Sequence, residues 1–198
     1  MPSMIAIPRP VLSIAATREP LSPGEAKKQL EIADSDTSHD SYIASLIAMA
    51  RERVEHDTGI VTLSSTWVLK LDCWPADEVI VLPLRPLSSV TSITYLDTAG
   101  SSQTLSSSLY EADSARVQPV IWKAYNQTWP ALQGSQNAVT VTFVAGYANP
   151  ASIPDLLRHA VKLALAQEFE DRTGSNAKAG SSDAYERIVS RLSRASYP

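Results

Sequence analysis

The hydrophobic pattern of this 198-residue sequence changes its period twice, and this change constrains the fold more than any other feature. Apolar residues recur at helical spacing before residue 60, alternate with polar residues in short stretches between 61 and 150, and return to helical spacing after 151. A spacing of three and four predicts an amphipathic helix, whereas a period of two predicts a strand. Helical segments are therefore expected on both sides of a β-rich block.

Two helices are predicted before the block. Ser22-Pro23-Gly24-Glu25 is typical of a capped helix start with proline in the first turn, and this short helix ends near Glu31. A second helix is predicted from Asp40 to Thr58, with Gly59 as its stop signal. Its apolar stripe consists of Ile43, Leu46, Ile47, Ala50 and Val54.

Two further helices are predicted after the block. Ser152-Ile153-Pro154-Asp155 indicates another capped start, and the long helix that follows ends between residues 171 and 174. Residues 175–182 are small and polar, as in a flexible linker. A last helix is expected from Asp183 to about Ala195.

The block between the helices contains about six short strands separated by turns. Alternation predicts strands at 66–72, 79–82, 90–96, 103–105 and 139–144, and Tyr110 and residues 117–121 indicate further short strands. Many short strands with turns between them favour an antiparallel sandwich or barrel over a parallel sheet. The predicted fold class is therefore α+β: a helical bundle core of three to four helices with an inserted antiparallel β-sandwich or barrel-like block.

The expected domain organisation follows from these elements. Residues 1–20 form an extended N-terminal arm, 21–60 and 151–174 the helical core, 61–150 the β-rich insertion, and 175–198 a linker and C-terminal helix or tail. The arm is apolar, so it is expected to lie against its own domain or a neighbouring subunit. The arm residues expected at a subunit interface are Ile5, Ile7, Val11 and Leu12.

Composition excludes several classes of protein. A net charge of −4 gives no general electrostatic case for nucleic-acid binding, and 44% apolar with 19% charged residues is ordinary for a globular protein. No apolar stretch approaches the about 20 residues needed to span a bilayer. Prolines interrupt the apolar N-terminus, which is therefore a poor secretion signal.

No constellation of reactive side chains is visible. The histidines His39, His56 and His159 have no partner at metal-ligand spacing, and the single cysteine, Cys73, is expected to be a half-buried strand thiol. Neither a G-x-S-x-G nucleophile elbow nor an H-E-x-x-H motif occurs. We therefore expect no catalytic residue, no metal and no cofactor, and predict that the protein is not an enzyme.

The four tryptophans leave alternatives open. Packing in the core or at its edges is the ordinary interpretation, while flat aromatic faces at Trp74, Trp122 or Trp129 would also suit a carbohydrate-binding module. A role for Trp74 and Trp129 at a subunit interface is the third possibility.

Several segments, taken in order, resemble the phage head–tail connector (adaptor) family in its long form. These segments cover roughly residues 20–172 and are Leu21–Lys27, Asp40–Gly59, Thr66-Trp67, Leu82–Leu87 leading into Val90–Tyr95, Val141–Tyr147 and Ile153–Leu157. The resemblance implies a structural protein with a helical core and a β insertion. It also implies a ring of identical subunits, commonly twelve, that lies under the portal and joins the capsid to the tail.

The resemblance further implies the protein's surroundings. Partners would be the portal protein, a downstream stopper or tail-terminator protein, and other copies of the chain, with DNA passing through the lumen without sequence-specific binding. The location would be the virion neck, after production in the host bacterial cytoplasm.

The resemblance also implies that the C-terminal segment reaches into the portal. The expected apolar anchor consists of Tyr185, Ile188, Val189 and Leu192, and the expected charge contacts are Arg187, Arg191 and Arg194. The alternative is a terminal helix that folds back on its own domain.

Overall fold

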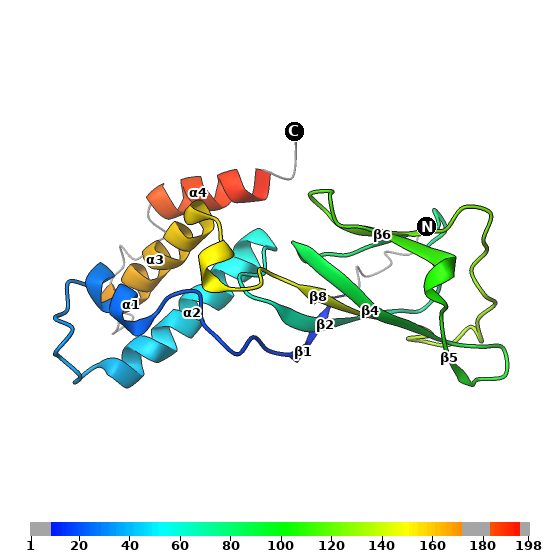
Figure 1. Cartoon of the computed structure of the whole chain (residues 1–198), viewed down its shortest axis with the longest axis horizontal. Helices are drawn as coiled ribbons and strands as arrows, with labels where there is room; N and C mark the ends of the chain where they lie inside the picture. Colours follow the sequence, from blue (N-terminus) through cyan, green and yellow to red (C-terminus); the bar gives the residue numbers. More distant parts are fainter. Residues whose placement is uncertain (1–8, 172–182, 195–198) are drawn as a thin grey trace. The chain divides into compact units, whose positions relative to one another are not determined.

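The structure, a computed structural model, describes residues 9–171 and 183–194. These residues form four α-helices and two antiparallel sheets, so the predicted α+β class is confirmed (Figure 1). The chain divides into two compact units. The β unit comprises residues 64–146 with the N-terminal segment through Ala15, and the helical unit comprises residues 16–63 together with the chain from Tyr147 onward.

The larger sheet of the β unit has five strands in the order β1-β2-β8-β4-β5. These strands are β1 Val11–Ile14, β2 Ser65–Leu71, β4 Leu87–Leu96, β5 Ser102–Thr104 and β8 Val139–Ala145. Alternate residues of β8 are at most 1% exposed, as a strand with one buried face requires. The last strand in sequence is thus the central strand of the sheet.

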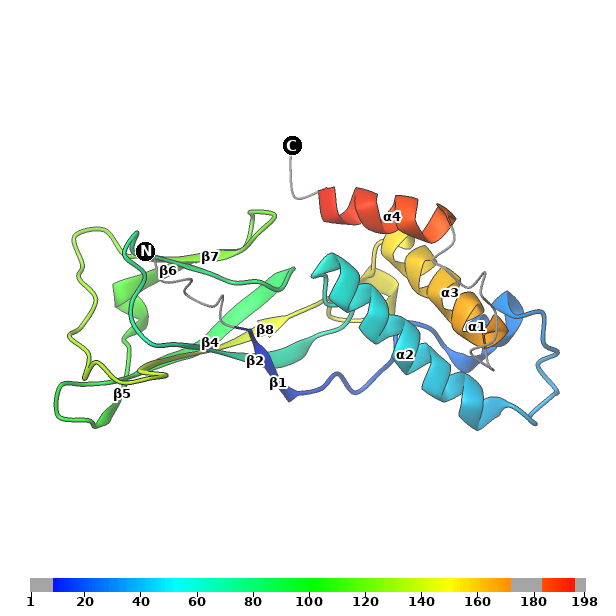
Figure 2. The ribbon, with the colours of Figure 1, turned by 180° about the vertical axis from the view of Figure 1, so that it is seen from behind.

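The smaller sheet has three strands in the order β3-β7-β6. They are β3 Val79–Val81, β7 Val120–Lys123 and β6 Tyr110–Asp113, which follows the short 3-10 turn η1 Ser107–Leu109. Ile80 and Ile121 pair across this sheet and are buried. Both sheets keep two edges, so the block is sandwich-like and not a closed barrel (Figure 2).

The N-terminal segment differs from the single extended arm predicted for residues 1–20. Val11 pairs with Val68 and Leu12 with Trp67, so β1 is a strand of the chain's own sheet. The last residues of the predicted arm, from Ala16 on, belong instead to the helical unit. The pattern did not reveal β1 because its sequence, Val-Leu-Ser-Ile, is short and does not alternate between apolar and polar residues. Ile5 and Ile7 lie outside the described residues.

The helical unit consists of α1 Pro23–Gln29, α2 Asp40–Thr58, α3 Asp155–Glu170 and α4 Asp183–Arg194. The predicted stripe of α2 is confirmed, because its five residues are at most 2% exposed. On α3 the buried residues are Leu157, Ala160, Val161, Ala164 and Leu165. These two faces form the centre of the unit's hydrophobic core.

The start of α1 and the end of α2 lie where the capping residues and the glycine in the sequence predicted them. The Ser22 hydroxyl accepts from Glu25 N, the Glu25 carboxylate accepts from Ser22 N at 2.9 Å, and Gly59 ends α2 in the left-handed region at φ 67°. The start of α3 is different. Ser152 belongs to a 3-10 turn, η2 Pro150–Ser152, that Asn149 caps, and Pro154 precedes Asp155 with no side-chain cap.

Candidate assembly surfaces

Strand β1 forms one edge of the larger sheet, and its apolar side chains are exposed. Val11 is 65% exposed, Leu12 44% and Ile14 63%, although large aliphatic side chains of this kind are most often buried. β1 is the last strand on its side of the sheet, so its outer edge pairs with no other strand of the described chain. Such an edge offers backbone hydrogen bonds and apolar area to another chain. Contact of Val11 and Leu12 with a neighbouring subunit stays a prediction.

Trp74 and Trp129 lie together, although 55 positions separate them in the sequence. Their rings are stacked with centroids 4.6 Å apart and an angle of 11° between planes, and Tyr95 lies 6.1 Å from Trp74. Trp74 Nε1 donates to the Pro130 carbonyl at 2.8 Å. Each indole therefore uses one face within the chain, which leaves less flat surface for a sugar. The interface role proposed for this pair stays a prediction.

A third group of exposed side chains lies on the smaller sheet. Val81 is 45% exposed and Trp122 39%, and Tyr125, just after β7, is 87% exposed. The Arg116 guanidinium lies 5.3 Å from the Trp122 ring centroid, so it covers part of that ring. For Trp122 the sequence suggested packing in the core or at its edges, or a sugar platform, and it did not single out Val81 or Tyr125. Alternation in β3 and β7 was the available signal, but three- and four-residue strands show it weakly.

Helix α4 lies against α2 and α3 and closes the core of the helical unit. Tyr185 is 2% and Leu192 8% exposed, while Ile188 and Val189 are half-buried against the same core. Of the two alternatives for this helix, the single chain thus shows the folded-back one. A portal contact by Tyr185 or Leu192 stays a prediction that requires α4 to separate from α2 and α3.

The attachment of α4 is polar as well as apolar. The Tyr185 hydroxyl donates to Asp57 Oδ2 at 2.8 Å, and the Arg53 guanidinium lies 4.6 Å from the Tyr185 ring centroid. Burial, reinforced by Asp57, raises the pKa of Tyr185 well above its usual value. The phenol is therefore held in its neutral, hydrogen-bonding form.

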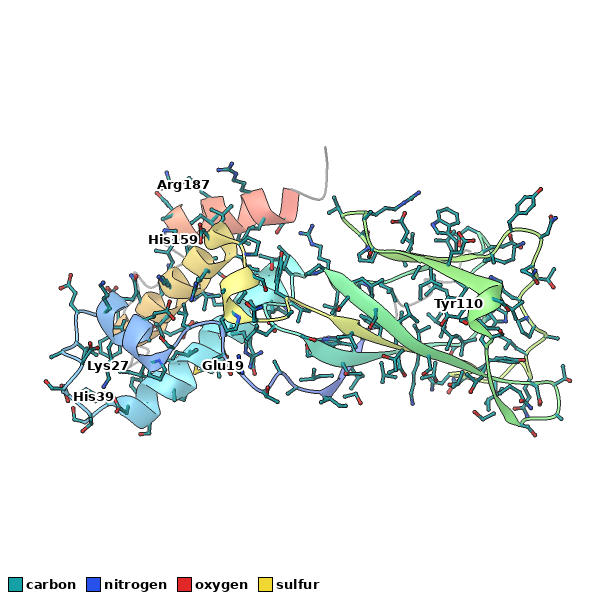
Figure 3. The ribbon with its side chains drawn as sticks, viewed as in Figure 1. Glu19, Lys27, His39, Tyr110, His159 and Arg187 are labelled. Carbon is teal, nitrogen blue, oxygen red and sulfur yellow. The ribbon has the colours of Figure 1, made fainter. Side chains whose placement is uncertain are left out.

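The outer side of α4 carries charges of both signs, since Asp183 and Glu186 are exposed there as well as two arginines. Arg187 and Arg191 are exposed, and Figure 3 marks Arg187 on the side of α4 that faces away from α3. The Arg194 side chain lies outside the described residues. These arginines are placed to meet an acidic partner without any movement of α4.

Other charged side chains of the helical unit hold helices together. Arg53 binds Glu168 at 2.9 Å and so joins α2 to α3, and Arg158 binds Glu25 at 2.8 Å and joins α3 to α1. The buried Lys27 ammonium binds Asp40 at 2.6 Å. The Ser22 backbone N–H is the main cause of a lowered Glu25 pKa. These charges have structural partners and do not converge on a common point.

The described parts of the chain contain neither a cluster of metal-ligating side chains nor a helix suited to span a membrane. Over residues 9–171 and 183–194, no three metal-ligating side chains form a group. None of the four described helices has both the length and the hydropathy of a membrane span. Cys73 is exposed in the bend after β2, which corrects the expected half-buried strand thiol.

Comparisons with known proteins agree with the resemblance seen in the sequence. Residues 24–113 match the model of the phage gp6-like head-tail connector protein family. No curated protein sequence gives a significant match. The resemblance to head–tail connector proteins is thus confirmed over that part of the chain.

Solved structures extend the similarity to the whole fold. A chain in the virion of a native gene transfer agent (GTA) particle has a TM-score of 0.78 at 21% identity, covering 92% of this chain and 94% of that one. A chain in the neck of an empty GTA particle, solved with C6 symmetry, has a TM-score of 0.76 at 22% identity and the same coverage. A third, in the neck of a native GTA particle solved with C12 symmetry, has a TM-score of 0.67 at 24% identity, covering 94% of both chains.

Proposed function

We propose that this protein is a structural head–tail connector, or adaptor, in the neck of a tailed phage or phage-like particle. Several copies form a ring, commonly of twelve, that joins the portal protein to a downstream stopper or tail-terminator protein. The chain is made in the host bacterial cytoplasm and carries out no chemistry of its own. DNA passes through the lumen, and the net charge of −4 favours passage without phosphate contacts.

One observation carries this proposal: both units, and not one alone, have counterparts in chains from GTA particle necks, at nearly full coverage in each direction. The connector family model matches independently across α1, α2 and the first half of the β unit. A particle neck with twelvefold symmetry requires repeated subunits in contact, and apolar exposed strands provide area for such contacts.

The portal is proposed to bind α4. Its outer side presents Arg187 and Arg191, and charged groups on a rim steer association with an acidic surface. Ile188, Val189, Tyr185, Leu192 and Arg194 would join the contact once α4 leaves the helical core. The remaining proposed contacts, Ile5, Ile7, Val11, Leu12, Trp74 and Trp129, would lie between subunits of the ring.

Electron microscopy of purified particles tests the proposed function. Particles from cells that produce the chain should show symmetric neck density that fits both units, between capsid and tail. Cells that lack the chain should accumulate heads without tails, and a plasmid copy should restore tailed particles. A neck with no density for the chain, or normal tailed particles without it, contradicts the proposal.

The portal contact has a separate test. Arg187→Glu with Arg191→Glu should abolish capture of the chain by immobilised portal protein while far-ultraviolet circular dichroism stays unchanged. Glu186→Gln, an exposed change on the same helix, is the matched control and should bind as the wild type does. Undiminished capture of the double variant would exclude this side of α4 as the portal contact.

A further inference from the structure

Two separate apolar surfaces of the β unit have no cover within the described chain. The β1 edge consists of Val11, Leu12 and Ile14. The small-sheet face consists of Val79, Val81 and Trp122, on the side of the sheet opposite the buried Ile80 and Ile121. Val120 points to the same side but is only 7% exposed, so the open part of this face is limited to the other three residues. The strand β1 and the smaller sheet lie on opposite sides of the β unit (Figures 1 and 2).

These surfaces account for nearly all large exposed hydrophobic side chains of the described residues. Val11, Leu12 and Ile14 belong to the β1 edge, Val81 and Trp122 to the small-sheet face, and Tyr125 follows β7 directly. The exception, Met49, stands alone on α2. A single exposed apolar side chain is ordinary, whereas grouped ones indicate contact with another chain.

The β1 edge is basic. Arg9 is exposed just before β1, and Lys70 is exposed on β2. Val11 lies opposite Val68 in an antiparallel pair, so the same register brings position 9 opposite Lys70. Two cations therefore lie at one end of this apolar edge.

The small-sheet face is acidic. Glu111 lies opposite Trp122 in the β6–β7 pair and is exposed. Arg116 and Lys123 bind Asp113 and Glu78 at 2.9 and 2.6 Å. Of the charged residues around this face, Glu111 and the exposed Asp77 are left without an ion pair in the described chain. The two surfaces are thus both apolar and carry opposite charge.

We infer that the β1 edge of one copy binds the small-sheet face of the next copy, and that this contact builds the proposed ring. The inference rests on the proposed function and names its subunit interface. Two unlike surfaces on opposite sides of a subunit give a head-to-tail contact, which closes into a ring when the rotation allows.

Cross-linking within particles tests the pairing. In a Cys73→Ser background, Leu12→Cys with Val81→Cys should give a ladder of covalent oligomers when particles are treated with a short bis-maleimide. Each single-cysteine variant should stay monomeric on the same gel, because its thiol faces a surface without one. A ladder from the pair and monomers from both singles support the inference.

Other outcomes of the cross-linking experiment would contradict either the inference or the proposed function. Dimers from a single-cysteine variant indicate like-to-like contact and overturn the inference. The inference is also overturned if the double-cysteine variant is present in the neck but gives no ladder of oligomers. That result would not contradict the connector function. Absence of the wild-type chain from particle necks instead overturns the proposed function.

Charge reversal gives a second, independent test. Lys70→Glu or Glu111→Lys alone should lower the amount of chain in particles several-fold, because like charges then face each other across the contact. The two changes together should restore it. Two singles that incorporate normally, or a double variant no better than either single while its melting temperature matches the wild type, would overturn the pairing.

Discussion

Ser22 and Glu25 show that a few neighbouring residues can determine where a helix begins. The hydroxyl and the carboxylate satisfy each other's backbone N–H groups, and Glu25 also binds Arg158 of α3. These two reciprocal hydrogen bonds form a capping box. Its two residues are only three positions apart, so the sequence alone was enough to predict it. The ion pair with Arg158 was not predictable, because 133 positions separate its members.

Ser22→Ala should lower the free energy of unfolding by about 1 kcal/mol, because α1 loses its cap. Ser22→Thr keeps a hydroxyl at the same place and should cost much less. Urea denaturation followed by circular dichroism measures both. Equal stability of wild type and the alanine variant would show that the cap contributes nothing.

Glu25 should make stability depend on pH in the acid range. Its pKa is lowered in the folded chain, first by the Ser22 N–H, from an ordinary value of 4.5. A lowered pKa stabilises the fold fully above pH 4.5, and this stabilisation is lost as pH falls through the folded value. Glu25→Gln should therefore flatten the decline in melting temperature below pH 4.5. An unchanged pH profile would contradict this role.

At the scale of elements, the sequence predicted those with a buried stripe and a capped end. The helix α2 was predicted at its observed bounds, Asp40–Thr58, because five apolar residues and Gly59 act together. The strand β1 was missed since its short sequence does not alternate between apolar and polar residues. The exposed apolar surfaces on β1 and on the smaller sheet could not be predicted either. Their exposure depends on the order of the strands in each sheet and on which side of the sheet is covered.

Helix α4 should loosen when Tyr185 loses its hydroxyl. Tyr185→Phe removes the hydrogen bond to Asp57 and should weaken the docking of α4 by roughly 2 kcal/mol, the usual contribution of a bond to a charged group. Amide exchange in residues 183–194 should become faster while α2 changes little. Ser190→Ala, an exposed change on the same helix, should leave exchange unchanged.

Alkaline solution should release the same helix. The pKa of Tyr185 is raised above its ordinary 10.0, chiefly by burial. The neutral phenol is therefore favoured in the fold, and its stabilisation is complete below pH 10 and lost as pH rises through the folded value. Amide exchange is itself catalysed by hydroxide, so the quantity to compare is the protection of α4 relative to an unfolded chain at the same pH. This protection should fall above pH 10 in the wild type, and Tyr185→Phe should remove the fall. A fall of equal size in both proteins would contradict it.

At the scale of the whole molecule, each unit has its own core, so damage to one should stay local. Leu157→Ala should cost about 2–5 kcal/mol and accelerate exchange in α1, α2 and α4. Val141→Ala should instead accelerate exchange in β2 and β4, which flank β8. Faster exchange throughout the chain from either change would show that the two units unfold together.

The connector function was predicted from several sequence segments that occur in the order typical of the connector family. No catalytic or binding site contributed to that prediction. No single segment was diagnostic, but their order spanned both units, as do the fold similarities. The alternative of a sugar-binding module depended on flat indole surfaces, which Trp74 and Trp129 use against each other and Trp122 shares with Arg116. Spatial stacking of this kind is not visible in a linear sequence.

The central place of β8 in the larger sheet fixes an order of events during synthesis. Strands β2 and β4 are both made before β8, yet neither pairs with the other in the finished sheet. Most of the sheet therefore has to wait until Val139–Ala145 has left the ribosome, and α3, which closes the helical core, comes later still. Long-range closure of this kind folds slowly. Until then β2 and β4 each keep an unpaired edge, because β8 is the strand that lies between them.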